Sequence, residues 1–160
     1  MNKPPDQGMA RPARPFLPPR RLPTRLAQVQ TYWNDLRRGE NAVPFSDDVN
    51  LSAIPELSGN LVLVEVFERP QRFRFSRVGQ ELLKGGGECS ITGSFADEME
   101  VCRPFEFFLA QASVTVEASS PTFYRHRSTG AKGDDGKGYV RLLLPTWGGG
   151  RIDMLIGAVV

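Results

Sequence analysis

The chain has 160 residues, 40% of them hydrophobic and 24% charged, which are the proportions of one soluble globular domain. No apolar run approaches the about 20 residues that cross a bilayer, and the N-terminus lacks the apolar stretch of a secretory signal. We therefore expect no membrane insertion and a cytoplasmic location. The net charge of +2 divides into +5 on residues 1–25 and −3 on the remainder, so the body is a poor nucleic-acid binder.

The first 24 residues (MNKPPDQGMARPARPFLPPRRLPT) contain seven prolines and no apolar periodicity. Proline removes the amide donors that helices and sheets need, so this composition predicts a disordered tail over residues 1–24. The alternative is a Pro-rich ligand for a partner, or a weak basic anchor. A folded domain over residues 25–160 follows the tail.

An amphipathic helix is predicted directly after the tail, over residues 25–38. Thr24 is a suitable N-cap and Gly39 a suitable stop. The apolar residues recur at three- and four-residue steps, which places them on one face of the helix. Such a stripe packs on a sheet or on a second subunit. We expect a homodimer in which it forms the interface, with Trp33 as the anchor; the stripe consists of Leu26, Val29, Trp33 and Leu36.

Two β-rich runs come next, at residues 60–68 and 72–79, after a short helix or turn near residues 51–57. A short turn between the runs predicts a β-hairpin. The first run is apolar on both faces, which indicates a strand covered on both sides. In the second run, alternation groups Phe73 and Phe75 with Arg77 on one face.

The pattern then becomes helical, with one turn at QELL and a longer helix over residues 105–117. Three further strands are predicted at residues 121–128, 138–146 and 151–159. Strands on both sides of a helical block favour an α+β fold with an antiparallel sheet.

This order of elements resembles that of a PAS domain, and short motifs add to the likeness. Tyr32-Trp33 with Leu36-Arg37-Arg38-Gly39 resembles the opening of a PAS-like family frequent in alphaproteobacteria (the PAS_5 group). Similar matches to that family, in order along the chain, are Phe73-Arg74-Phe75 with Arg77-Val78-Gly79, Ile91-Thr92-Gly93, Leu142-Leu143-Leu144-Pro145 and Ile152-Asp153 to Ile156-Gly157. The resemblance covers roughly residues 26–158.

What the resemblance implies is a sensory or protein-interaction module. Its fold would be a five-stranded antiparallel sheet with short helices between strands 2 and 3, an N-terminal amphipathic helix, and a small pocket under the helices. We expect a stand-alone sensory domain that binds a small apolar or weakly polar molecule or a partner protein, with its effector in another chain. The candidate pocket residues, chosen from the helical block and the sheet, are Phe105, Phe108, Tyr124, His126 and Met154.

Complete catalytic, metal and cofactor motifs are absent from the sequence. His126 is the sole histidine, which excludes His-rich zinc centres. Neither G-x-S-x-G nor a P-loop occurs. Cys102 lacks the Asn-Cys-Arg setting of flavin-binding relatives, and we interpret Cys89 and Cys102 as free thiols. No cofactor is expected.

Two alternatives to a ligand sensor stay open. One is a cone-shaped α+β enzyme that uses Asp153 with Tyr139 or His126 as an acid–base pair. The other is an adaptor whose core is filled by side chains, so that it contains no cavity.

Overall fold

The computed structural model describes residues 16–84, 91–99, 103–127 and 138–160. Five antiparallel strands form one sheet in the order β2-β1-β5-β4-β3. The predicted α+β class and five-stranded antiparallel sheet are confirmed. Cys89, Cys102, the glycines at 85–87 and the loop at 128–137 lie outside the described residues. The strands are β1 (Leu61–Phe67), β2 (Arg72–Val78), β3 (Thr122–His126), β4 (Tyr139–Gly148) and β5 (Arg151–Val159).

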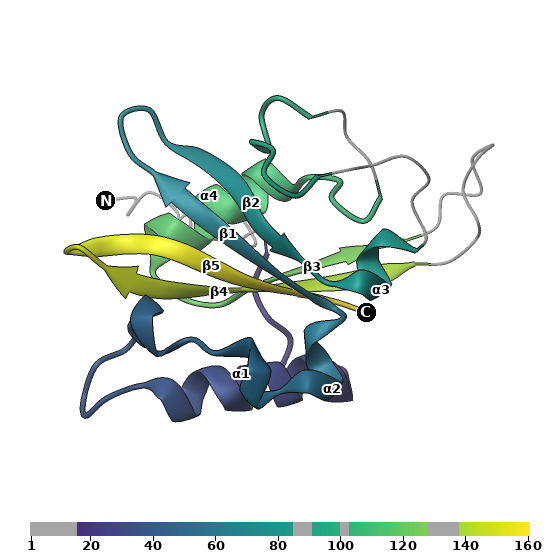
Figure 1. Cartoon of the computed structure of the whole chain (residues 1–160). Helices are drawn as coiled ribbons and strands as arrows, with labels where there is room; N and C mark the ends of the chain where they lie inside the picture. Colours follow the sequence, from purple (N-terminus) through teal and green to yellow (C-terminus); the bar gives the residue numbers. More distant parts are fainter. Residues whose placement is uncertain (1–15, 85–90, 100–102, 128–137) are drawn as a thin grey trace, which may run out of the picture.

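Both faces of the sheet are covered (Figure 1). The helix α4 (Phe108–Ala118) lies on one face, and α1 (Thr24–Leu36) lies on the other. Three short helical segments lie between α1 and β1 in the sequence: η1 (Ser46–Asp48), η2 (Leu51–Ala53) and α2 (Pro55–Ser58). On the α4 side β1 is buried at Val62, Val64 and Val66. On the α1 side Leu61 is buried but Leu63 and Glu65 are half-buried, so the cover that the sequence predicted on both faces is only partial.

The α1 stripe is buried within its own chain, which corrects the expectation of a dimer surface. Leu26, Val29 and Trp33 pack with the β4 and β5 side chains of the covered face, and Trp33 is only 3% exposed. The indole Nε1–H of Trp33 donates to the carbonyl of Pro145 at 2.8 Å. Leu36 is half-buried at the end of the helix. The apolar stripe of α1 covers one face of the sheet, so its burial does not require a second subunit.

The ends of α1 differ from the prediction in detail. Thr24 is the first helical residue, and its cap position is occupied by Pro23 with no side-chain hydrogen bond. Arg37 is extended and Arg38 lies beyond the helix, where it bonds Asp48 instead of the last carbonyls.

A bulge in the β1–β2 hairpin moves Arg77 away from the face of Phe73 and Phe75. The register shifts between Leu63 and Val64, and Arg77 then pairs with Leu63. An extra residue at that point reverses the side-chain alternation, so the simple period of two fails beyond Phe75. The outer edge of β2 is covered by residues 91–96, whose backbone bonds Phe73 and Phe75.

Between β2 and β3 the chain forms α3 (Gln80–Leu83) and then α4. The long helix starts at Phe108, three residues later than predicted, because Phe107 adopts a left-handed conformation with φ of 58°. Phe105 is buried all the same, in the turn that precedes the helix. Leu109, the second residue of the helix, is 42% exposed.

The predicted boundary of the tail lies too far along the chain. Residues 16–23 are described, and two of them contact the sheet layers: the Phe16 carbonyl accepts the amide of Phe123 at 2.8 Å, and Leu22 packs against the core under α1. Proline prevents helix and sheet formation but does not prevent an extended segment from lying along an edge. Residues 1–15 lie outside the described part of the chain.

We expect Trp33→Ala to lower the free energy of unfolding by about 3–5 kcal/mol, because it removes a large buried side chain from the α1 layer. Trp33→Phe should cost about 1–2 kcal/mol, since it keeps most of the ring but leaves the Pro145 carbonyl without its donor. Urea unfolding followed by circular dichroism measures both. Equal losses for the two variants would show that the Pro145 bond, and not ring packing, dominates.

Candidate functional site

A pocket of about 480 Å³ lies on the α4 side of the sheet. It is bounded by β2 through Phe75, by the edge segment through Ala96 and Met99, and by the start of α4. The residues that line it are nearly all apolar: Phe75, Ala96, Met99, Phe105, Glu106, Phe107, Phe108, Leu109 and Ala110.

Three mutually packed phenylalanines form the floor of this pocket. The ring of Phe75 lies 5.0 Å from that of Phe105 and 4.9 Å from that of Phe108, between centroids. Phe105 and Phe108 meet edge to face at 6.0 Å. These are favourable separations for aromatic pairs, so the floor is a rigid apolar surface.

The rim of the pocket exposes apolar surface to solvent. Phe107 is 67% exposed and Leu109 is 42% exposed. The left-handed backbone of Phe107, a costly conformation for a residue with a Cβ, directs its ring outwards. Strain and exposed aromatic surface occur together here, which is typical of a binding site.

Arg141 of β4 holds the pocket wall to the sheet. Its side chain is 0% exposed, and its guanidinium donates to the carbonyls of Pro104 at 2.8 Å and Glu106 at 2.9 Å. A third bond, of 2.8 Å, goes to Oε1 of Gln111 in α4. Burial lowers the pKa of Arg141 to about 10, because desolvation disfavours the charged form.

A chain of polar side chains continues from Gln111 under α4. Its Nε2 donates to Oγ1 of Thr122 at 3.1 Å, and Thr122 in turn lies 2.6 Å from Oγ1 of Thr115. Thr115 also donates to the Gln111 carbonyl. Every member is buried and bonded, so this network fixes α4 and β3 to one another instead of offering free polar groups to a ligand.

Titratable rings gather beside the pocket, at the end of β3 and the beginning of β4. The Tyr139 hydroxyl donates to the Glu106 carboxylate, and burial, reinforced by that bond, raises the pKa of Tyr139 above its ordinary range. His126 stacks on Tyr139 with 4.8 Å between centroids. The Tyr124 hydroxyl lies 3.0 Å from His126 Nδ1, and burial raises the pKa of Tyr124.

The structure brings four of the five predicted pocket residues to one face of the sheet. Phe105 and Phe108 line the pocket. Tyr124 and His126 lie next to it, in the ring cluster with Tyr139, and are not among its lining residues. Tyr124 contacts Phe107 of the pocket rim directly and also the Arg141 guanidinium, whereas His126 stacks on Tyr139.

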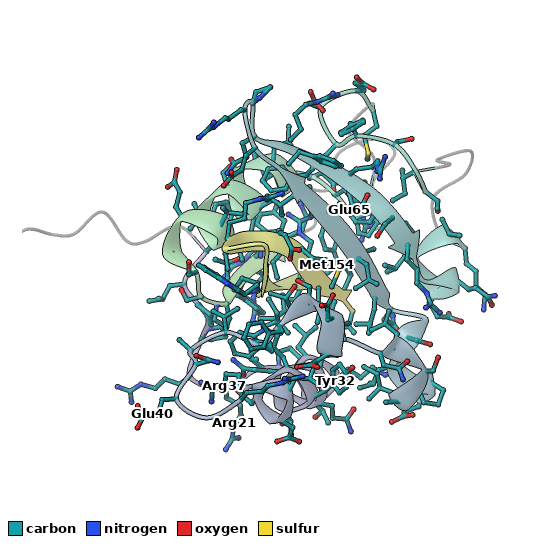
Figure 2. The ribbon with its side chains drawn as sticks, turned by 60° about the vertical axis from the view of Figure 1, so that its left-hand side comes forward. Arg21, Tyr32, Arg37, Glu40, Glu65 and Met154 are labelled. Atoms are coloured by element: carbon teal, nitrogen blue, oxygen red, sulfur yellow. The ribbon has the colours of Figure 1, made fainter. Side chains whose placement is uncertain are left out.

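Met154 was placed wrongly. It pairs with Glu65 of β1 (Figure 2), and alternation along β5 puts it on the same face as Ile156, which packs in the α1 layer. The register of β4 and β5 shifts between Thr146 and Trp147, opposite residues 152–154. This bulge changes which side chains of β5 lie on each face of the sheet. The sequence alone carries no signal for that shift.

The acid–base pair of the enzyme alternative is not assembled. Asp153 lies against Gly148 and accepts a hydrogen bond from Ser46. Tyr139 and Gly148 are the first and last residues of β4, which at about 3.3 Å per residue lie roughly 25–30 Å apart. His126 pairs with Tyr139 and shares that distant end.

Arg141, Glu106 and Phe107 are the important residues that the sequence reasoning missed. Arg141 interrupts the apolar run of β4, and a charged residue within a strand buried on both faces is an available signal for a buried polar network. The sequence contains no comparable signal for Phe107. Its exposure follows from its left-handed backbone conformation, which no neighbouring residue in the sequence requires.

We expect Arg141→Met to lower the free energy of unfolding by about 3–5 kcal/mol, because it leaves two carbonyls and the Gln111 amide buried without a donor. Adding Gln111→Leu removes one of those orphaned groups. The double variant should therefore lose less than the sum of the single variants, as a double-mutant cycle of denaturant unfolding would measure. Additive losses would show that the two side chains act independently.

The raised pKa values of Tyr124 and Tyr139 predict a loss of stability at high pH. The phenols bind protons more tightly in the folded state, so their contribution is complete below about pH 10 and is lost as the pH rises above it. Tyr139→Phe should flatten the fall of the unfolding free energy between about pH 10 and 12. An unchanged slope in urea unfolding at these pH values would contradict this assignment.

Comparison of the chain with protein-family models, with curated proteins and with solved structures finds no match. Within the described ranges, no helix is long and apolar enough to span a membrane. The same ranges contain no cluster of three or more His, Cys, Asp or Glu side chains that could hold a metal ion. Among the described residues, the α4 pocket combines an apolar lining with exposed aromatic and aliphatic rim residues, and it is the candidate site.

Proposed function

We propose that this chain is a PAS-like sensory domain that binds a small apolar molecule in the α4 pocket and passes the change on to a partner protein. The observation that carries the proposal is the pocket itself. Its floor is a cluster of packed phenylalanines, and its rim is an exposed phenylalanine on a strained backbone.

The dimensions and chemistry of the pocket support a small ligand. A volume of about 480 Å³ lies within the range of about 300–1,000 Å³ that small-molecule sites occupy. Such sites are mostly apolar with a few polar groups that orient the ligand. Glu106 is the charged residue among those lining this pocket, and its carboxylate is engaged by Tyr139.

The order of elements supports the PAS-like part of the proposal. An amphipathic helix precedes two strands, a helical block follows, and three strands close the chain. The pocket is lined largely by residues of the helical block, where the family resemblance implies a ligand site. The motif that resembles the family's link, Ile91-Thr92-Gly93, belongs to the edge segment beside the pocket.

The two alternatives are less well supported. An adaptor filled by its own side chains is expected to contain no cavity, and the apolar pocket beside α4, which is open to solvent at its rim, favours a ligand site instead. The enzyme alternative depends on Asp153, whose carboxylate bonds Ser46 at the far end of β4. The rings of Tyr124, His126 and Tyr139 pack against one another and do not line the α4 pocket; Glu106, which accepts the Tyr139 hydrogen bond, is the titratable residue that does.

The proposal is tested with N-phenyl-1-naphthylamine, a neutral apolar probe whose fluorescence rises on transfer out of water. Ala110 lines the pocket and is exposed, so Ala110→Trp should fill it and weaken probe binding by about tenfold or more. Ala118→Trp is the matched control, because this alanine is also exposed on α4 but lies outside the pocket. Native mass spectrometry of freshly purified protein would show a retained ligand of low mass.

Two results would contradict the proposal. Absence of probe binding by the wild-type chain would favour the adaptor alternative. Equal binding by the Ala110 and Ala118 variants would place the probe elsewhere.

A further inference from the structure

The segment Phe16–Pro23, which we call the strap, links the two layers that cover the sheet. Its first residue lies on the edge strand β3, where the Phe16 carbonyl accepts the amide of Phe123. Its last residue leads directly into α1 on the opposite face. Figure 1 shows this purple segment passing from the α1 layer behind the sheet towards α4.

The described contacts hold the start of the strap weakly. Phe16 has a φ of 71°, a left-handed conformation that is unfavourable for a phenylalanine. Its ring meets Tyr124 at 6.2 Å, near the outer limit for an aromatic pair. Leu17, the next residue, is 66% exposed. One backbone hydrogen bond and one ring contact oppose the backbone strain, so a small change in either can release the strap.

Tyr124 connects the strap to the pocket. Its ring touches Phe16 and also Phe107, at 5.9 Å between centroids. It also lies 4.8 Å from the Arg141 guanidinium, which in turn bonds the carbonyls of Pro104 and Glu106 in the pocket wall. The pocket rim, Tyr124 and the strap are thus in continuous contact.

We propose that occupation of the α4 pocket releases the strap from the edge of β3. Phe107 is two-thirds exposed in this structure, so closing its ring over an apolar ligand buries surface that is now in water. In that movement the ring leaves Tyr124. The Tyr124 ring keeps its contacts with His126, Tyr139 and Arg141 but loses the phenylalanine on its pocket side, so it can turn away from Phe16 and weaken that contact. The inference rests on the proposed function, since it requires a ligand in that pocket.

The release is a way to carry a signal from one face of the sheet to the other. The strap ends at α1, so its detachment on the α4 side frees the chain that enters the α1 layer. Coupling between two sites is reciprocal. A variant with the strap already released should therefore bind the ligand more tightly, by the same factor with which the ligand releases the strap.

Amide hydrogen exchange in the full chain, followed by NMR with and without N-phenyl-1-naphthylamine, tests the proposal. The Phe123 amide is the direct readout, because its acceptor is the strap carbonyl. At saturating probe its exchange should accelerate by about fivefold or more. Amides of β4 that bond within the sheet should keep their rates.

Three variants sharpen the test. In the Phe16→Ala variant the Phe123 amide should exchange rapidly even without probe. This variant should also bind the probe about fivefold more tightly. Phe107→Ala should remove the response at Phe123, even when enough probe is added to saturate it. Leu17→Ala alters an exposed strap residue that has no role in the chain of contacts, and it should behave as the wild-type chain does.

The outcomes separate this inference from the function on which it rests. If the probe shifts the signals of Leu109 and Ala110 but leaves Phe123 exchange unchanged, the strap inference is wrong and the pocket function stands. If the probe shifts neither, the pocket function fails and the strap inference fails with it. The inference would also be wrong if Phe123 exchange became faster in Leu17→Ala and not in Phe16→Ala. Leu17, and not Phe16, would then hold the strap on β3.

Discussion

The buried guanidinium of Arg141 is the interaction on which the site depends. It lies on β4, in the middle of an apolar run, and is 0% exposed. A buried charge is costly unless every donor is satisfied, and here carbonyls and an amide meet that need instead of a carboxylate. Because those carbonyls belong to the residues just before α4, Arg141 determines where the pocket wall lies.

The surroundings of Arg141 explain why the wall is positioned but not rigid throughout. Phe105 and Phe108 are fixed by the floor of packed rings. Phe107, between them in the sequence, faces outwards and contacts only the side of Tyr124 among the ring pairs described. The wall thus combines a fixed floor with an exposed ring that could gain burial, which is the combination that the proposed ligand response requires.

The sheet serves two layers with different tasks. The α1 layer is a packed core in which Trp33 joins the helix to β4 through the Pro145 carbonyl. The α4 layer contains the pocket and the buried polar network. Since the strap runs between the layers at the β3 edge, the two are connected by backbone as well as through the sheet.

The sequence by itself determined the element order, the α+β class and most of the buried faces, because alternation and helical periodicity are local properties of the chain. It identified Phe105 and Phe108 from their place in the helical block. It could not place Met154 or Arg77, since each follows a bulge that only strand pairing creates. It could not tell whether the α1 stripe meets a sheet or a second subunit, because both bury the same apolar side chains. Tertiary structure decided these points, and it alone brought Arg141, Tyr124 and Phe107 together, because their contacts join segments far apart in the chain.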